Sequence, residues 1–165
     1  MKENYYVFLD IDGTMWDIKY VLYSLYFGSY SYLRQPNIQS VDALNLLIKE
    51  LSKSYNVQIV ISSVLRKFCK RDIKLMKEFG LKYNGNIQIT PLFCSSRNIA
   101  IKKYLLTKEN NNNYLIIDDN PFVTLSKKHT NVIKTNFLNG SLSVQNVQDF
   151  LAKINVTANV EPTKE

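Results

Sequence analysis

The chain has 165 residues, of which 45% are hydrophobic and 21% charged, and its formal net charge is +7. This length and composition predict one globular domain, and they exclude a membrane span because no apolar run approaches the required ~20 residues. The positive charge favours anionic partners such as nucleic acid, although a basic solvated surface without a partner would give the same value. Residues 1–4 lead straight into the first expected strand, so we expect no signal peptide and a cytoplasmic protein.

Strand and helix signals alternate along the chain. The expected strands are 5–10, 57–62, 86–89, 114–118 and 131–134, and the expected helices are 41–54, 65–79, 96–106, 122–128 and a last one after Ser143. Helix caps are expected at Ser40, at Ser95 or Ser96 and at Ser143, and a helix stop at Gly80. Apolar residues at helical spacing, Ile99 and Val144 among them, should face the core. This alternation predicts an α/β fold, a Rossmann-like doubly wound parallel sheet over residues 1–155, followed by a flexible tail at 156–165.

The first expected strand ends in two carboxylates. Asp10 and Asp12 follow the apolar run 5–9, one residue apart. Residues i and i+2 of a strand point to the same side, so both carboxylates would aim at one spot unless Gly13 bends the chain. Neighbouring carboxylates repel each other, and Mg²⁺ is a hard cation suited to relieve such a pair. An acidic turn without a metal is the structural alternative.

A second acidic pair repeats this arrangement later in the chain. Asp118 and Asp119 come at the end of the apolar run 114–117. The carboxyl ends of parallel strands form the ligand site of a doubly wound sheet, so both acidic pairs are expected at one edge. We therefore predict a magnesium site formed by Asp10, Asp12, Asp118 and Asp119, in which one of the last two binds the metal directly.

These motifs resemble those of the haloacid dehalogenase-like (HAD) phosphatases. The run Asp10-Ile11-Asp12-Gly13-Thr14 is similar to the first motif of that family, Ser62 to the second, and Asp118-Asp119 to the fourth. The resemblance covers residues 5–120 and implies the HAD core with a minimal cap. A narrower similarity, to the HAD domains of RNA-repair proteins, rests on Ile61-Ser62-Ser63-x-x-Arg66, Thr90-Pro91 and Arg97 ahead of an amphipathic helix. Leu65 departs from that subgroup, which has an aromatic residue there.

The acidic pairs predict phosphoryl transfer to a carboxylate. Asp10 is the candidate nucleophile, which would form an aspartyl-phosphate, and Asp12 is the candidate acid and base. Ser62 would donate a hydrogen bond to a phosphate oxygen. Arg97, in the first turn of its helix, is the first candidate for the cation that balances the transferred charge, with Lys102 and Lys103 as rivals.

Further candidates for substrate binding share a position beside these motifs: Gly13, Thr14, Ser63, Arg66 and Lys102.

Aromatic residues recur between the first strand and the first core helix. Trp16, Tyr20, Tyr23, Phe27 and Tyr30 follow one another at steps of three or four. An amphipathic segment that covers the sheet would show this pattern. A short lid over residues 15–39, whose aromatic rings stack on bases, would show it too. The segment is too short for a full cap domain, so the site should be open to macromolecular ends.

The sequence thus predicts a Mg²⁺-dependent phosphohydrolase that acts on phosphorylated nucleic-acid ends, as a monomer or weak dimer without a membrane partner. Two alternatives stay open. A 5′(3′)-nucleotidase or other small-molecule phosphatase would share the Asp-Asp-x-Pro ending at Asp118–Pro121. A non-catalytic protein could use the same fold for binding or assembly.

Overall fold

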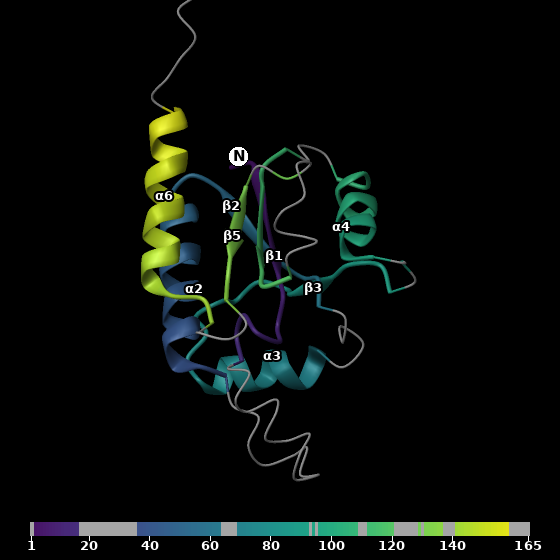
Figure 1. Ribbon diagram of the computed structural model, residues 1–165. Helices are drawn as coiled ribbons and strands as arrows, with labels where there is room; N and C mark the ends of the chain where they lie inside the picture. Colours follow the sequence, from purple (N-terminus) through teal and green to yellow (C-terminus); the bar gives the residue numbers. More distant parts are fainter. Residues whose placement is uncertain are drawn as a thin grey trace, which may run out of the picture.

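Five parallel strands form one sheet at the centre of the molecule. The computed structural model describes residues 2–16, 36–63, 69–92, 94, 96–108, 112–120, 129, 131–136 and 141–158. The strands are β1 (Asn4–Leu9), β2 (Asn56–Ile61), β3 (Gln88–Ile89), β4 (Tyr114–Asp118) and β5 (Val132–Lys134). Their spatial order is β3-β2-β1-β4-β5, and every neighbouring pair is parallel (Figure 1). The predicted α/β parallel sheet is confirmed.

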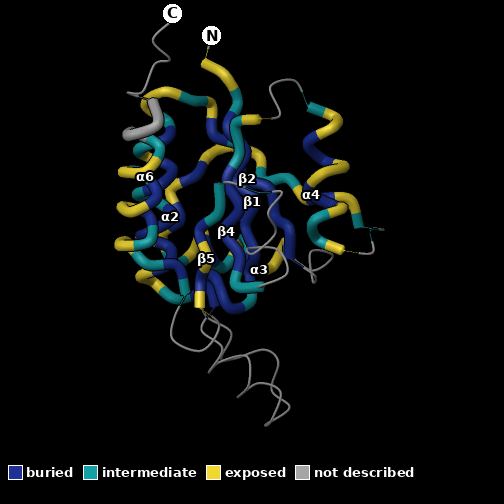
Figure 2. The backbone as a smooth tube through the Cα atoms, turned by 45° about the horizontal axis from the view of Figure 1, so that its top comes forward, coloured by how far each residue is buried: buried dark blue, intermediate teal, exposed yellow. Residues whose placement is uncertain are grey.

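Helices cover both faces of this sheet. α2 (Ile38–Leu51) and α6 (Val144–Ala158) lie side by side on one face, and α4 (Arg97–Leu105) lies on the other (Figure 1). α3 (Cys69–Glu78) crosses below the strand tips and adds Met76 to the core beneath α2 and α6. Figure 2 shows the strands buried between these helices. None of the helices in the described part of the chain is both long and apolar enough to cross a membrane.

The alternation of side chains along the strands explains the two layers. Tyr5, Val7 and Leu9 of β1 pack into the cluster under α2 and α6, whereas Tyr6 and Phe8 pack into the cluster under α4. Successive strand residues point to opposite faces, so a strand buried on both faces reads as a continuous apolar run. Residues that continue the Tyr6–Phe8 row therefore emerge on the α4 side of the sheet.

Most predicted element boundaries lie within a few residues of the observed ones. Ser96 caps α4, since its Oγ accepts a hydrogen bond of 3.3 Å from the Ile99 N–H. Ser143 Oγ accepts the Asn146 N–H at 3.2 Å at the start of α6. Gly80, after α3, has a φ of 97°, which favours glycine. The expected helix at 122–128 and the expected start of α3 at residue 65 lie outside the described residues.

Three expectations about helices are wrong. The cap of α2 is Asn37, whose side chain accepts from the Gln39 N–H, because the Ser40 hydroxyl instead donates to the Leu142 carbonyl within the core. Ile99 and Val144 do not face the core, being 42% and 40% exposed. They lie on the outward sides of their helices, whereas Ala100 and Ile101 of α4 and Val147 of α6 are fully buried. α6 also extends to Ala158, so residues 156–158 are helical within the range 156–165 expected as a tail, and residues 159–165 lie outside the described residues.

The described ends of the expected lid belong to the core. Met15 and Trp16 are fully buried in the cluster under α2 and α6, and residue 38 already begins α2. Trp16 is therefore a core residue, because burial of its large ring leaves no face on which a base could stack. Residues 17–35, with Tyr20, Tyr23, Phe27 and Tyr30, lie outside the described residues.

Candidate active site

The strand register brings three predicted site residues side by side. Leu9 of β1 pairs with Ile61 of β2 and with Ile117 of β4, so Asp10, Ser62 and Asp118 follow at one level of the carboxyl edge. The Asp10 N–H donates to the Ile117 carbonyl at 2.9 Å, and the Ser62 N–H donates to the Leu9 carbonyl at 3.0 Å.

All three of these side chains are fully buried. They continue the strand rows that pack under α4, and so that helix is the one that can reach them.

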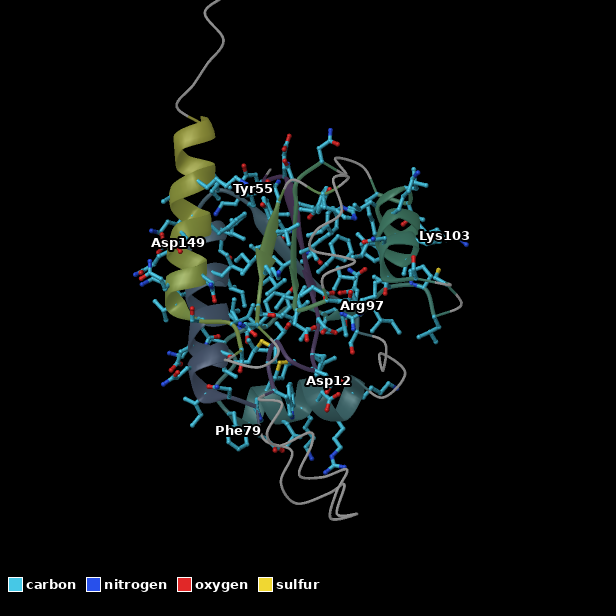
Figure 3. All side chains as sticks on the ribbon, viewed as in Figure 1. Asp12, Tyr55, Phe79, Arg97, Lys103 and Asp149 are labelled. Carbon is cyan, nitrogen blue, oxygen red and sulfur yellow. The ribbon has the colours of Figure 1, made fainter. Side chains whose placement is uncertain are left out.

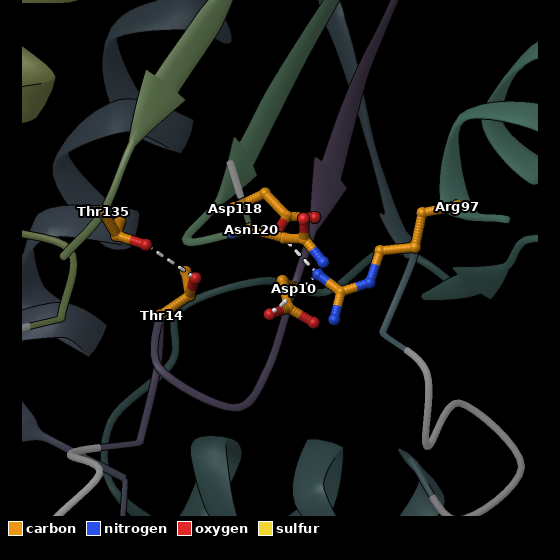
Figure 4. A network of polar contacts seen from close by, with 6 residues as sticks. All are labelled: Asp10, Thr14, Arg97, Asp118, Asn120 and Thr135. Carbon is orange, nitrogen blue, oxygen red and sulfur yellow. Dashed lines mark hydrogen bonds and ion pairs between the residues drawn. The ribbon is translucent and has the colours of Figure 1, made fainter. Parts of the chain in front are cut away.

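Arg97 supplies the cation at this edge. Its Nη1 donates to Asp118 Oδ1 at 2.6 Å and lies 3.1 Å from Asp10 Oδ2 (Figure 4). Only 12% of the Arg97 side chain is exposed. The rival residues Lys102 and Lys103 are exposed, and Figure 3 shows Lys103 on the far side of α4 from Arg97. Arg97 is thus the predicted cation that the structure brings into contact with the carboxylates.

The acidic residues fit a divalent cation. The carboxylates of Asp10, Asp118 and Asp119 offer oxygen atoms that all lie within 4.8 Å of one another. Asp118 Oδ2 is buried and accepts no hydrogen bond from the described residues. Three carboxylates facing one guanidinium leave an excess of negative charge, which a hard cation with oxygen ligands would neutralise. These three residues would hold such an ion.

Burial and mutual repulsion perturb the titration of this cluster. Burial raises the pKa of Asp10 well above its usual value, and the Asp118 charge raises it further, while Arg97 opposes both effects. Burial also raises the pKa of Asp118 against the opposing charge and hydrogen bond of Arg97. Burial by itself would lower the pKa of Arg97, but Asp10 and Asp118 raise it, so the guanidinium stays charged. The metal-free cluster therefore resists full ionisation.

Asp12 lies within a sharp bend of the chain. Gly13 has a φ of 78°, and the N–H groups of Met15 and Trp16 both donate to the Ile11 carbonyl. The bend that Gly13 allows is present, and Asp12 is partly exposed beside the buried Asp10. The carboxylate of Asp12 is not among those grouped within 4.8 Å in the described residues. This position leaves Asp12 accessible to a substrate.

Thr14 faces away from the carboxylates. Its Oγ1 lies 2.9 Å from Thr135 Oγ1, where either hydroxyl can be the donor, and both residues are buried (Figure 4). The Thr14 carbonyl also accepts the Leu142 N–H at 2.9 Å. These bonds fasten the loop after β1 to the end of β5. Thr135 is a residue that sequence reasoning missed, because no local pattern connects two threonines 121 residues apart.

Two further polar residues complete the edge. Ser62 Oγ is buried and has no hydrogen-bond partner among the described residues, so it is available to a ligand. The Asn120 N–H donates to Asp118 Oδ1 at 2.8 Å and fixes the orientation of that carboxylate, a contact that sequence reasoning also missed. Ser63 is buried next to Ser62. Arg66 lies outside the described residues.

Comparisons with solved structures agree with the fold. Two solved structures of the HAD domain of effector protein Lem4 from Legionella pneumophila share the fold, each with a TM-score of 0.54. The first is 16% identical and covers 96% of this chain and 97% of its own; the second, an inactive mutant, is 15% identical and covers 96% of each. No curated protein matches this sequence.

The family comparison covers most of the chain. Residues 6–147 match the model described as the HAD domain in Swiss Army Knife RNA repair proteins. This range includes every residue of the acidic edge, from Asp10 to Asp119. The chain therefore belongs to the family of HAD domains found in Swiss Army Knife RNA repair proteins.

Proposed function

We propose that this chain is a Mg²⁺-dependent phosphohydrolase that acts on phosphorylated nucleic-acid ends. The observation that carries the reaction type is the buried contact of Arg97 with both Asp10 and Asp118. A carboxylate nucleophile, a cation and a neighbouring group of oxygen ligands are the parts that phosphoryl transfer to an aspartate requires. Asp10, Arg97 and the carboxylates of Asp118 and Asp119, which we assign to these roles, lie at the carboxyl edge of the sheet.

The first step is the attack of an Asp10 carboxylate oxygen on phosphorus. The bond from phosphorus to the leaving oxygen breaks, and Asp12 gives its proton to that oxygen, so that an alcohol departs and an aspartyl-phosphate remains. Arg97 balances the negative charge of the transferred group, and the Ser62 hydroxyl donates to one of its oxygens. A bound Mg²⁺ would supply charge neutralisation between the anionic nucleophile and the anionic substrate.

The second step returns the enzyme to its starting state. Asp12, now a carboxylate, takes a proton from water, and the resulting hydroxide attacks the phosphorus of the aspartyl-phosphate. The bond between phosphorus and the Asp10 oxygen breaks, and inorganic phosphate leaves. The partly exposed position of Asp12 supports this role, because the acid and base must reach both the leaving group and water.

Two observations support a nucleic-acid substrate. The matching family is named for domains in RNA repair proteins, and the chain carries a net charge of +7. A basic protein attracts polyanions and steers them towards its surface. A mononucleotide substrate would use the same chemistry, and the ending Asp118-Asp119-Asn120-Pro121 favours that second candidate.

Hydrolysis of para-nitrophenyl phosphate with Mg²⁺ and with excess chelator tests the reaction type. We expect turnover with the metal only, and no turnover under either condition would overturn the proposal in favour of a binding protein. We then compare kcat/KM for three substrates: RNA with a 5′-phosphate, RNA with a 3′-phosphate and a mononucleotide. A higher kcat/KM for a mononucleotide than for either RNA end would replace the nucleic-acid proposal with a nucleotidase.

A further inference from the structure

A cavity lies on the α4 side of the sheet, at the end opposite the acidic edge. Its volume is about 420 Å³, and Asn4, Tyr6, Gln58, Gln88, Thr107 and Lys108 line it. The first four belong to β1, β2 and β3, and the last two directly follow α4. Pockets of this volume are large enough for a nucleoside-sized group.

Hydrogen bonds among the side chains of this cavity leave donors unused. Gln88 Oε1 accepts the Tyr104 hydroxyl at 2.6 Å, and Gln88 Nε2 donates to Gln58 Oε1 at 3.5 Å. Asn4 Oδ1 accepts Asn56 Nδ2 at 2.7 Å. Gln58 Nε2 and Asn4 Nδ2 therefore keep N–H groups that are bonded to none of the described residues. A ligand rich in acceptors would satisfy them.

The cavity carries positive charge and no acidic side chain. The Lys108 ammonium lies 4.7 Å from the centre of the Tyr104 ring, which holds it beside the opening. Glu3, which precedes Asn4, accepts a hydrogen bond from Asn113, and Glu109, which follows Lys108, lies outside the described residues.

An adjoining cavity of about 450 Å³ shares Gln58, includes Lys2 and Lys82, and also lacks acidic residues. Its lining also includes Ile48 of α2 and Ser52, the C-cap of that helix, so this adjoining cavity lies towards the α2 side of the sheet and shares only Gln58 with the cavity beside Lys108.

α4 connects this cavity to the acidic edge. Arg97 begins the helix beside Asp118, and Thr107 and Lys108 follow its other end. Lys102 and Lys103 are exposed between them. From Asn4 to Asp10 the chain runs six residues along β1, so the cavity lies about 20 Å from the candidate nucleophile. A strand of several nucleotides can span this distance.

We propose that the cavity beside Lys108, at the amino end of the sheet, forms an accessory binding site for single-stranded nucleic acid. The strand runs along α4, its phosphates meet the lysines, and its acceptors meet Gln58 and Asn4. This site rests on the nucleic-acid part of the proposed function, for which it supplies the place where the body of the substrate binds. It predicts that affinity depends on length, since a short strand held at the acidic edge cannot reach Lys108.

The test measures RNA affinity by fluorescence anisotropy. It uses RNA without a terminal phosphate in two lengths, about 12 and about 3 nucleotides. Lys108→Gln is compared with Lys49→Gln, which removes the same charge from an exposed site on α2, on the opposite face. We expect Lys108→Gln to weaken binding of the longer RNA several-fold and to lower the slope of log K against log salt by about 0.7. Gln58→Leu should weaken binding without changing that slope. Lys49→Gln should change neither quantity.

Equal effects of the two lysine variants, or equal affinity of wild type for both RNA lengths, would overturn the accessory site. Wild-type hydrolysis of para-nitrophenyl phosphate is measured in parallel. If the wild type hydrolyses the ester but the two lysine variants bind RNA equally well, the accessory site alone is overturned. If the lysine variants differ in RNA binding as expected but the wild type hydrolyses no ester, the phosphatase proposal is overturned and the accessory site is supported.

Discussion

The guanidinium of Arg97 donates a hydrogen bond of 2.6 Å to Asp118, joining the first residue of α4 to the last residue of β4. The same Nη1 lies 3.1 Å from Asp10 at the end of β1. One cation thus bridges a candidate nucleophile and a candidate metal ligand, both fully buried. A charge in this position can orient the carboxylates and compensate the phosphoryl group as it is transferred.

Replacement of Arg97 by Gln should lower kcat for a small phosphate ester by at least about 10²-fold, the usual cost of losing one stabilising donor. Arg97→Lys should recover part of this loss, because the charge returns without the planar fork. Steady-state kinetics would measure both variants against Lys49→Gln, which removes one charge far from the site. A comparable loss in Lys102→Gln or Lys103→Gln would instead assign the cation to that lysine.

Asp10→Asn should lower activity by at least ~10³-fold, on the order of 4 kcal/mol in barrier, because the amide is no nucleophile. The same change should raise the Tm of the metal-free protein, since it removes a buried charge that Asp118 repels. Kinetics and thermal unfolding with chelator would measure the two effects. Asp12→Asn is the matched variant, expected to lose activity without the gain in Tm because Asp12 is partly exposed. Retention of more than a tenth of wild-type turnover would exclude Asp10 as the nucleophile.

The metal-free protein should lose stability as pH rises above the ordinary carboxyl range. The folded-state pKa values of Asp10 and Asp118 are raised above the usual 3.8, so the folded state binds more protons than the unfolded state in this window. The free energy of unfolding therefore falls with increasing pH. The extra stability is complete at a pH below the usual carboxyl pKa, and it is lost as the pH passes the raised pKa values. Urea unfolding in the presence of chelator, at about pH 5 and about pH 7, would measure this fall in the free energy of unfolding. Asp10→Asn should reduce the change of unfolding free energy with pH. An unchanged pH dependence in this variant would contradict Asp10 as its cause.

Mg²⁺ should raise the Tm of the wild-type protein, and the rise should continue with the logarithm of the metal concentration, because the ion binds the folded state alone. Mn²⁺ should replace it in activity, whereas Ca²⁺ should stabilise the protein without supporting turnover, since its larger and looser shell misplaces the attacking oxygen. Thermal unfolding and kinetics over a metal titration would separate these effects. Asp118→Asn should weaken the metal-dependent rise in Tm. Full activity in excess chelator would contradict a metal-dependent mechanism.

Ser62→Ala should impair catalysis but not stability, whereas Thr135→Val should lower stability. Ser62 Oγ has no hydrogen-bond partner among the described residues, so its removal should leave Tm unchanged or higher while raising KM or lowering kcat. Thr135→Val breaks the buried contact with Thr14 and should destabilise the protein by about 0.5–1.5 kcal/mol. Denaturant unfolding and ester hydrolysis on both variants would measure the difference. A destabilised Ser62→Ala would assign that hydroxyl to the fold.

The chain order of the elements and the acidic edge could be read from local sequence. Apolar runs of five or six residues predict buried strands, and the acidic pairs mark where two of them end. The predictions for Ile99 and Val144 are wrong, because the spacing of apolar residues in a helix does not specify which side of it meets the sheet. Trp16 shows the same limit, since spacing alone does not distinguish a buried ring from a ring in a lid.

The local sequence predicted that Asp10, Ser62 and Asp118 end parallel strands at one edge of the sheet, and the strand order β2-β1-β4, which makes them neighbours, came from the structure. Only the tertiary structure decided that Arg97, rather than Lys102 or Lys103, meets the carboxylates, since this depends on how α4 is rotated and placed over the sheet. The Thr14–Thr135 contact and the amide-lined cavity near Lys108 likewise join residues distant in the chain. Such pairings arise from packing between elements, and no local pattern of residues encodes them.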